Sequence, residues 1–579
     1  MDFGDLVLLA VELLRHHPEA YERFTSRFRY VHVDEFQDTN RVQYELLKLL
    51  VKPHRNLAVV GDDDQSIYRW RGAEVENILG FRETFPDATI VKLETNYRST
   101  GHILAAANAV IRNNARRHAK TLRTDSEDGE PVALSVVERS EQEAELVVRT
   151  LVDRIHDLGA SAGEFAILYR QNAQSRLFEE ALIRHRVPYQ LFGGTGFYER
   201  MEVKDILAYL RLTANPSSLQ DFLRVISTPN RGIGAKTVER LRAVGERLEL
   251  GGVRMLDAPA EALEAEGISK SGIKKLRELS TLLAEFRDVA ESSTATEVVR
   301  TIIEDTRYFE HLERSDPSTA EDRIENVREL VSSIAEHEER LRAEGAYEPE
   351  AELDGVGVAG ARTPLQAFLD RASLVSADDR TPESAKVSLM TLHTAKGLEF
   401  PVVFMVGLEE RTFPIQRAVD ALDPGEIEEE RRLCYVGMTR AERELILSAA
   451  RFRRIYGREE VRLPSRFLAE IPGGLIAAGG FDWSGGSPFF EPRGRAPRQR
   501  ADRVRRIRDR LPFTRPNDVG GPRRAAAGQP GLAQHLRCGN RRRLGRRRRA
   551  GAADDRVSTG RDEAGGRSLR AAPVGRPKA

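Results

Sequence analysis

Short apolar runs alternate with amphipathic stretches over the first 200 residues of the chain. A run of about four to eight apolar residues between turn formers is typical of a strand in a parallel sheet, whereas apolar residues three and four positions apart indicate a helix. The stretch EQEAELVVRTLVDRIHDL, residues 141–158, has the helical spacing. The candidate strands are 30–33, 56–60, 89–93, 132–137 and 165–170. This alternation predicts an α/β fold with a mostly parallel sheet that helices cover on both faces.

The pattern changes near residue 200, where helical spacing replaces the strands. The helical signal begins with VKDILAYLRLT, residues 203–213, and a polar, glycine-rich and acidic stretch at 343–363 predicts a flexible loop. Strands return at 387–393, 401–407 and 445–450. We therefore expect an α/β domain that an all-helical insertion interrupts.

Charge is distributed unevenly along the chain, although the formal net charge is zero. Residues 481–579 carry a surplus of about 17 positive charges, so the first 480 residues are about equally negative. This Arg-, Gly- and Pro-rich end, from about residue 473, has the composition of a disordered tail and also that of a GC-rich gene translated out of frame. A basic arm is typical of proteins that meet nucleic acid, and a solvated tail without a partner is the alternative.

Length and cysteine content exclude several classes of protein. A chain of 579 residues exceeds a single hydrophobic core, so we expect at least three domains. The longest apolar runs are shorter than the roughly 18 residues of a membrane span, and no secretory signal opens the sequence, so we expect a cytoplasmic location and no membrane partner. Cys434 and Cys538 cannot build a disulfide framework, which fits a reducing compartment.

Two carboxylates follow the first candidate strand. Asp34 and Glu35 stand at its carboxyl end, where an α/β protein that hydrolyses nucleotides places the groups that hold Mg²⁺ and activate water. Ordinary acidic turn residues are the commoner alternative for such a pair. The pair alone therefore indicates nucleotide chemistry only weakly.

The second candidate strand leads into GDDDQSIYRWRGA, residues 61–73. This segment interleaves the aromatic residues Tyr68 and Trp70 with arginines, Arg71 among them. Aromatic rings in a basic setting suit stacking on the bases of a single strand, at about 1–3 kcal/mol per base. Burial of both rings in a core is the alternative.

Three later segments carry polar residues beside strands or helix ends. Arg98 precedes a helical stretch and is placed to stabilise charge on a transferring phosphoryl group, although a surface arginine is the commoner outcome. His393, Thr394 and Glu399 lie in a polar turn between two strands, and Arg440 lies at the end of a helical stretch. A metal role for His393 is weak because no further ligand stands at suitable spacing.

Five segments in this order and with these separations resemble those of the UvrD, PcrA and Rep group of superfamily 1 DNA helicases. The segments are 29–50, 56–73, 91–108, 387–414 and 428–449. The likeness runs over about residues 1–470. It implies RecA-like P-loop NTPase motor domains, with an all-helical insertion in the second, and an ATP-dependent DNA helicase that translocates 3′ to 5′ on single-stranded DNA in repair or replication.

The resemblance also implies roles for single residues. Asp34 would hold Mg²⁺, Glu35 would polarise the attacking water, and Gln65 would sense the γ-phosphate of ATP. Tyr97 would stack on adenine, Glu399 would reach the ribose, and Arg98 and Arg440 would be the two arginine fingers. The residues that would contact single-stranded DNA are Tyr68, Trp70, Arg71, His393 and Thr394.

A further candidate DNA contact lies in the helical part, in TPNRGIGAKTVERL, residues 228–241. A Gly-apolar-Gly turn between helices can point backbone N–H groups at a phosphate of duplex DNA. The residues concerned are Gly232, Ile233, Gly234 and Thr237. A purely structural turn is an equal alternative.

The chain departs from the family in one respect that affects activity. The phosphate-binding loop G-x-x-x-x-G-K-[ST] does not occur in the sequence, and only about 30 residues precede Asp34, so we expect an amino-terminal truncation. Without that loop the chain is expected to have negligible ATPase activity. A non-catalytic DNA- or partner-binding remnant and a helicase-nuclease subunit are the alternative functions.

The family resemblance predicts a division of the chain into five parts. The parts are a remnant of the first motor domain at 1–88, the first part of the second motor domain at 89–198, the helical insertion at 199–384, the resumed second motor domain at 385–472, and the tail at 473–579. The expected partners are single-stranded DNA, duplex junctions, and repair or replication proteins.

Overall fold

The computed structural model describes residues 1, 3–345, 363–377 and 385–477. Most of the predicted flexible loop at 343–363 and of the predicted tail at 473–579 lies outside these described residues. In the described ranges, no helix combines the length and apolar character that crossing a bilayer requires.

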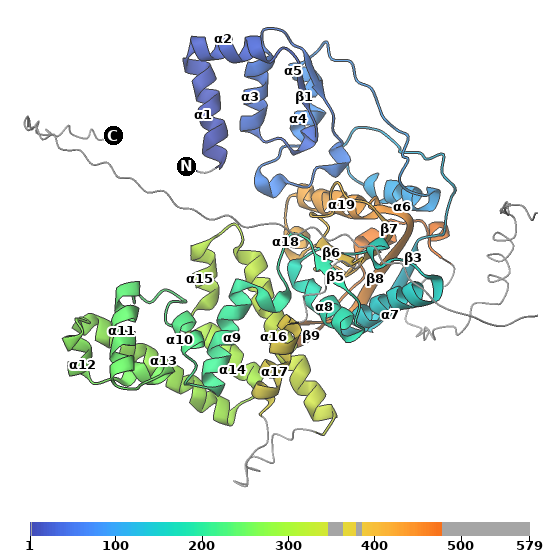
Figure 1. Ribbon diagram of the computed structural model, residues 1–579. Coiled ribbons are helices and arrows are strands. Elements are labelled where there is room, and N and C mark those ends of the chain that lie inside the picture. Colours follow the sequence, from blue (N-terminus) through green and yellow to red (C-terminus); the bar gives the residue numbers. More distant parts are fainter. Residues whose placement is uncertain (2, 346–362, 378–384, 478–579) are drawn as a thin grey trace, which may run out of the picture. The chain divides into compact units, whose positions relative to one another are not determined.

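The amino-terminal part contains a two-stranded parallel sheet of β1 (Val31–Val33) and β2 (Leu57–Val59). The helices around it are α1 (Phe3–His16), α2 (Pro18–Arg27), α3 (Arg41–Val51), α4 (Glu76–Leu79) and α5 (Phe81–Thr84) (Figure 1). The valines of both strands pack on a small core of Phe36, Leu47 and Val51. The prediction that 30–33 is a buried strand is wrong in part, because His32 and Tyr30 are exposed. Period-two alternation puts Tyr30 and His32 on the face opposite that of the two valines.

A seven-stranded sheet has the strand order β3-β8-β7-β4-β6-β5, with β9 paired to β8. All of its pairs are parallel except that between β8 and β9. The strands are β3 (Ala133–Arg139), β4 (Phe165–Tyr169), β5 (Tyr189–Leu191), β6 (Val387–Thr391), β7 (Phe400–Met405), β8 (Ala441–Ile455) and β9 (Arg458–Val461). Strands from before and after the helical stretch therefore share one sheet.

Helices cover both faces of this sheet, as the sequence pattern predicts (Figure 1). On one face α7 (Ser140–Leu158) and α8 (Ser175–Arg184) pack on Phe165, Ile167 and Phe404. On the other face α6 (Gly101–Ile111) and α19 (Pro424–Met438) pack on Leu168, Met405 and Leu447. The short helices α18 (Gln416–Asp420) and α20 (Arg466–Ala469) complete this part. The predicted helix at 141–158 is confirmed as α7.

The predicted strand at 89–93 is wrong, since this segment has no sheet partner. Its apolar residues Ile90, Val91 and Leu93 are 51%, 74% and 79% exposed. An apolar run becomes a strand only where neighbouring strands satisfy its backbone groups, and the segment instead connects α5 to α6.

Between β5 and β6 every described element with regular hydrogen bonding is helical. The helices are α9 (Met201–Ala214), α10 (Leu219–Val225), α11 (Ala235–Arg247), α12 (Ala260–Ala265), α13 (Lys270–Ser292), α14 (Ala295–Asp305), α15 (Tyr308–Ser315), α16 (Ala320–Ala343) and α17 (Pro364–Ala377). They share one apolar core that includes Tyr209, Phe286 and Val327.

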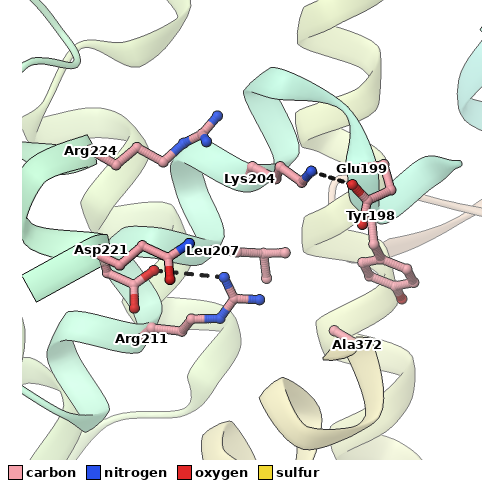
Figure 2. A pocket seen from close by; sticks show the side chains of 9 residues that line it. Tyr198, Glu199, Lys204, Leu207, Arg211, Asp221, Arg224 and Ala372 are labelled. Atoms are coloured by element: carbon pink, nitrogen blue, oxygen red, sulfur yellow. Dashed lines mark hydrogen bonds and ion pairs between the residues drawn. The ribbon is translucent and has the colours of Figure 1, made fainter. Parts of the chain in front are cut away.

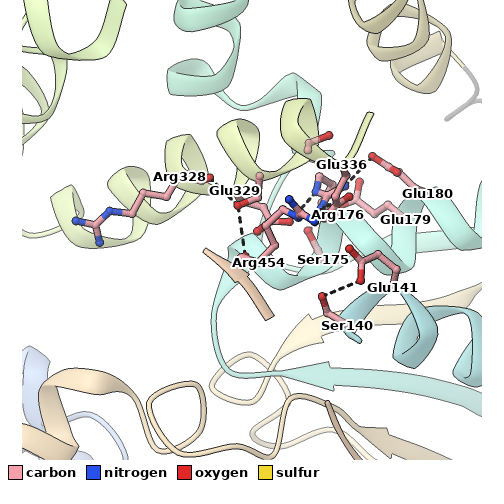
Figure 3. Close-up of polar contacts among 12 residues, drawn as sticks. Ser140, Glu141, Ser175, Arg176, Glu179, Glu180, Arg328, Glu329, Glu336 and Arg454 are labelled. Atoms are coloured by element: carbon pink, nitrogen blue, oxygen red, sulfur yellow. Dashed lines mark hydrogen bonds and ion pairs between the residues drawn. The ribbon is translucent and has the colours of Figure 1, made fainter. Parts of the chain in front are cut away.

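A buried arginine of α8 ties the sheet to this helical part (Figure 3). Arg176 is 1% exposed, and its guanidinium donates to Glu329 and Glu336 of α16, at 2.6 and 2.9 Å. It also pairs with Glu180 on its own helix, at 3.3 Å. Removing one partner from a buried pair leaves an uncompensated charge, so this cluster holds α8 and α16 together.

Candidate functional site

The two predicted carboxylates lie at the carboxyl end of β1, and both are exposed. Glu35 has a left-handed backbone, φ 49°, and its N–H donates to Asp34 Oδ1 at 2.9 Å. Gln37 Nε2 donates to Glu35 Oε2 at 2.6 Å. This geometry presents both carboxylates to solvent, as binding of a cation and a water requires.

A buried lysine from the turn after β6 lies against the acidic segment. Lys396 is 7% exposed at its side chain, and its Nζ lies 3.2 Å from Glu35 Oε2 and 2.5 Å from Asp38 Oδ2. The same ammonium donates to the carbonyl oxygen of Gln65 at 2.9 Å. Burial raises the pKa of Asp38, and the bond from Lys396 opposes that rise. Sequence reasoning assigned no role to Asp38 or Lys396. The one indication of a role for Lys396 was its position in the polar turn between two strands.

Gln65 belongs to a second charged cluster, built on the three aspartates that precede it. Its Nε2 donates to Asp62 Oδ2 at 2.7 Å. Lys120 Nζ lies 2.5, 2.7 and 3.2 Å from oxygens of Asp62, Asp63 and Asp64. Burial lowers the pKa of Lys120, but the three carboxylates outweigh it and leave the pKa raised.

Arg117 completes this second cluster with two parallel bonds to Asp64, from Nε at 2.8 Å and from Nη2 at 2.6 Å. Such a bidentate pair is stronger than a single charge-assisted bond. Sequence reasoning missed Arg117 and Lys120, because they lie more than 50 residues from their partners and in no motif.

The predicted arginine fingers lie together with Glu399. Arg98 Nε donates to Glu399 Oε2 at 2.6 Å and its Nη1 to the carbonyl of Thr439 at 3.4 Å. Arg440 is 2% exposed and donates to the carbonyls of Val436 and Leu398, at 2.9 and 3.1 Å. Burial and the neighbouring Arg98 lower the pKa of Arg440 to about 10. Tyr97, in contrast, is 85% exposed.

The aromatic residues of the 61–73 segment meet His393. The Arg71 guanidinium lies over the rings of Trp70 and Tyr68, 4.5 and 5.5 Å from their centroids. The rings of Trp70 and His393 meet edge to face at 6.4 Å. Trp70 is 54% exposed, which excludes the core alternative for this ring. Burial, with Arg170 and Arg71 nearby, lowers the pKa of His393 to about 3, so the ring is neutral near pH 7.

Thr394 lies in the turn after β6, where its Oγ1 is 2.9 Å from Thr391 Oγ1.

The predicted hairpin lies among the helices between β5 and β6. In the hairpin, Gly232 has φ +68° and its carbonyl accepts from Lys275 Nζ at 3.1 Å. Ile233 is buried in the helical core, so only its backbone can face a ligand. Gly234 caps α11, and the Thr237 N–H donates to its carbonyl at 2.9 Å.

A cavity of about 220 Å³ in the helical part contains none of the predicted site residues (Figure 2). Its three basic side chains are paired within the protein: Lys204 with Glu199, Arg211 with Asp221 at 3.7 Å, and Arg224 with Asp205 at 2.6 Å. The paired charges of this cavity do not indicate a ligand site, so the candidate site stays at the residues that the sequence motifs indicate.

The residues present fit a magnesium nucleotide in part. Asp34, Glu35, Arg98 and Arg440 are the carboxylates and cations that such a ligand requires. Among the described residues, no three His, Cys, Asp or Glu side chains gather as metal ligands. The sequence contains no Gly-Lys pair, which the phosphate-binding loop G-x-x-x-x-G-K-[ST] requires.

Comparison with known proteins gives matches over most of the chain. Residues 1–86 match the UvrD/REP helicase N-terminal domain and residues 91–451 match the UvrD-like helicase C-terminal domain. The ATP-dependent DNA helicase PcrA of Staphylococcus aureus is 40% identical over 476 residues, and that of Bacillus subtilis is 39% identical over 477 residues. Each alignment covers 82% of this chain and 62% of the relative.

Proposed function

The chain belongs to the UvrD-like helicase family, and from that premise we propose that it forms part of an ATP-dependent DNA helicase. The protein would translocate 3′ to 5′ on single-stranded DNA, with ATP and Mg²⁺ as cofactors, in DNA repair or replication. Its substrates would be single-stranded DNA and duplex junctions.

The proposed architecture has two RecA-like motor domains. Residues 1–88 would belong to the first, residues 89–198 and 385–472 to the second, and residues 199–384 to a helical insertion. The parallel sheet that joins β4, β5 and β6 supports this division, because its strands come from both sides of the helical stretch. The hairpin at Gly232, Ile233, Gly234 and Thr237 would touch duplex DNA with its backbone.

The proposed nucleotide side consists of the charged residues at the strand ends. Asp34 would hold the metal and Glu35 would orient a water, while Tyr97, Glu399, Arg98 and Arg440 would contact the nucleotide. Mg-ATP would supply the phosphoryl-transfer chemistry when bound.

One observation carries the proposal: Lys396 touches both sides of the site. Its ammonium pairs with Glu35, donates to the Gln65 carbonyl and lies 5.4 Å from the Tyr68 ring centroid. Tyr68 leads directly to Trp70 and Arg71. A helicase must link the nucleotide to the DNA, and this lysine joins the residues proposed for each.

Binding of single-stranded DNA tests the proposal. Fluorescence anisotropy with a labelled oligothymidine should show binding that weakens with salt, because phosphate contacts release counterions. Trp70→Ala should weaken it roughly tenfold, within the about 1–3 kcal/mol of one stacked base. The matched control is Arg82→Ala, which removes an exposed arginine of α5. Equal affinity of wild type and Trp70→Ala would refute the assignment of this surface.

For the chain by itself we propose DNA binding without ATP turnover. The lack of a Gly-Lys pair favours this non-catalytic reading over turnover, because β- and γ-phosphates need backbone N–H groups and a lysine.

A further inference from the structure

Arg69 lies between the two aromatic residues proposed to contact DNA, yet its contacts are with α19. Its Nη2 donates to Asp423 Oδ2 at 2.8 Å, and its Nη1 lies 3.3 Å from Glu426 Oε1. The backbone N–H of Arg69 donates to Glu429 Oε1 at 3.2 Å. Three carboxylates from one end of a helix thus hold both the backbone and the side chain of a single residue.

The first turn of α19 is shaped for this contact. Asp423 is the residue that caps the helix, and its Oδ1 accepts from the Gly425 N–H at 2.9 Å while Oδ2 faces Arg69. A Cβ atom on Gly425 would lie 2.9 Å from Arg69 Nη1, so a larger residue at this position would displace the guanidinium. Glu426 and Glu429 are three residues apart and therefore project from the same face of the helix.

The contact fixes the short turn that presents the DNA-contacting side chains. Arg69–Arg71 form one turn of 3-10 helix, in which the Arg71 and Gly72 N–H groups donate to the carbonyls of Tyr68 and Arg69. From this turn the Arg71 guanidinium lies over the Trp70 ring, and the Trp70 ring meets His393 edge to face. Because such a turn has few internal bonds, its orientation depends on what its backbone is attached to.

We propose that Arg69 is a positioning residue, which attaches the Trp70 and Arg71 surface to α19 through Asp423, Glu426 and Glu429. The inference rests on the proposed function for the identity of the ligand, single-stranded DNA. We call the contacts of Arg69 with Asp423, Glu426 and Glu429 the clamp. Since α19 ends at Met438, the clamp attaches this surface to the helix that leads into Arg440.

A simple surface ion pair predicts different behaviour. Arg69 and Asp423 are 48% and 43% exposed at their side chains, and exposed ion pairs contribute little to stability. Variants of the clamp should therefore fold. A structural ion pair would leave the environment of Trp70 and the DNA affinity unchanged, whereas a positioning role changes both.

The experiment uses Trp70 as its own reporter. The sequence contains two tryptophans, Trp70 and Trp483, so Trp483→Phe leaves Trp70 as the sole indole. In this background, acrylamide quenching measures the exposure of Trp70 without DNA, and titration with oligothymidine gives the affinity. Arg69→Ala should raise the quenching constant at least 1.5-fold and weaken DNA binding three- to tenfold, and Arg69→Lys should recover part of both.

The decisive variant is Asp423→Asn with Glu426→Gln, which keeps Arg69 charged and keeps a capping residue on α19. If Arg69 acted only by attracting DNA phosphates, removal of two nearby negative charges would strengthen binding. The positioning role predicts weaker binding and higher quenching, with no further loss when Arg69→Ala is added.

Unchanged quenching in Arg69→Ala, or tighter DNA binding in the double carboxylate variant, would overturn the inference. If the Trp483→Phe parent bound no DNA, the proposed function would fail instead, and the quenching comparison would still decide whether Arg69 positions the turn. Arg82→Ala serves again as the matched control.

Discussion

Loss of the Lys120 ammonium should loosen the segment that carries Gln65. In Lys120→Ala, Asp62, Asp63 and Asp64 keep their charges but lose the cation that lies 2.5 to 3.2 Å from each of them. Asp63 and Asp64 are 4% and 1% exposed at their side chains, so water cannot replace it.

The structure sets the expected magnitude. Breaking a buried pair by removing one partner costs about 3–5 kcal/mol. Arg117 still pairs with Asp64 through two bonds, and Asp62 keeps 23% exposure of its side chain, so the lower end applies. We expect a loss of about 3 kcal/mol, which corresponds to a roughly hundredfold larger equilibrium constant for local opening.

Hydrogen–deuterium exchange followed by mass spectrometry measures this opening peptide by peptide. Peptides that cover 62–71 and 112–123 should exchange roughly a hundredfold faster in Lys120→Ala, and adding Asp63→Asn should restore part of the protection. Lys52→Ala, at an exposed lysine after α3, is the control. Exchange within threefold of wild type in both peptides would refute the idea that Lys120 holds this segment.

Two further predictions concern α16 and the arginine of α8 that contacts it. Arg176→Met should lower the free energy of unfolding, measured in urea, by about 3–5 kcal/mol, because Glu329 and Glu336 would remain buried without their cation. Adding Glu329→Gln should recover part of the loss, and a loss below about 1 kcal/mol would contradict this. Burial lowers the pKa of His337 to about 4, below its unfolded value of about 6.5, so its contribution to stability is complete above pH 6.5 and is lost as the pH falls toward 4. Between pH 7 and pH 5 the wild type should lose about 2 kcal/mol more than His337→Leu, measured by urea unfolding at each pH, and parallel losses would show that His337 is not the group responsible.

The sequence predicts the strands with apolar runs, including β3 at the end of the strand order, and misses the short strand β5 and the polar strand β9. β4, β6 and β7 are almost wholly buried, so their apolar runs are long enough to be recognised. β9, with the sequence REEV, is exposed at every position, and an edge strand of this kind carries no apolar signal. The run at 89–93 misleads for the opposite reason, since Val91 and Leu93 are apolar but exposed.

The site is predictable as far as local motifs extend. Trp70, Arg71 and His393 are indicated by residue type and meet in the structure. The ion pairs that hold the surrounding segments in place join residues far apart in the sequence. Lys120 is 58 positions from Asp62, and Arg69 is 354 positions from Asp423. No periodicity or spacing links such pairs, so only the folded structure shows them.

ATP turnover in the presence of bound single-stranded DNA tests the central claim most directly. We propose that these 579 residues carry the DNA-contacting residues and the arginine fingers of a UvrD-like motor without its phosphate-binding loop. The purified chain, shown by anisotropy to bind an oligothymidine, should hydrolyse no ATP above background, beside the PcrA of Bacillus subtilis as the positive control. DNA-stimulated turnover comparable to that control, abolished by Glu35→Gln and therefore intrinsic to the chain, would contradict the account.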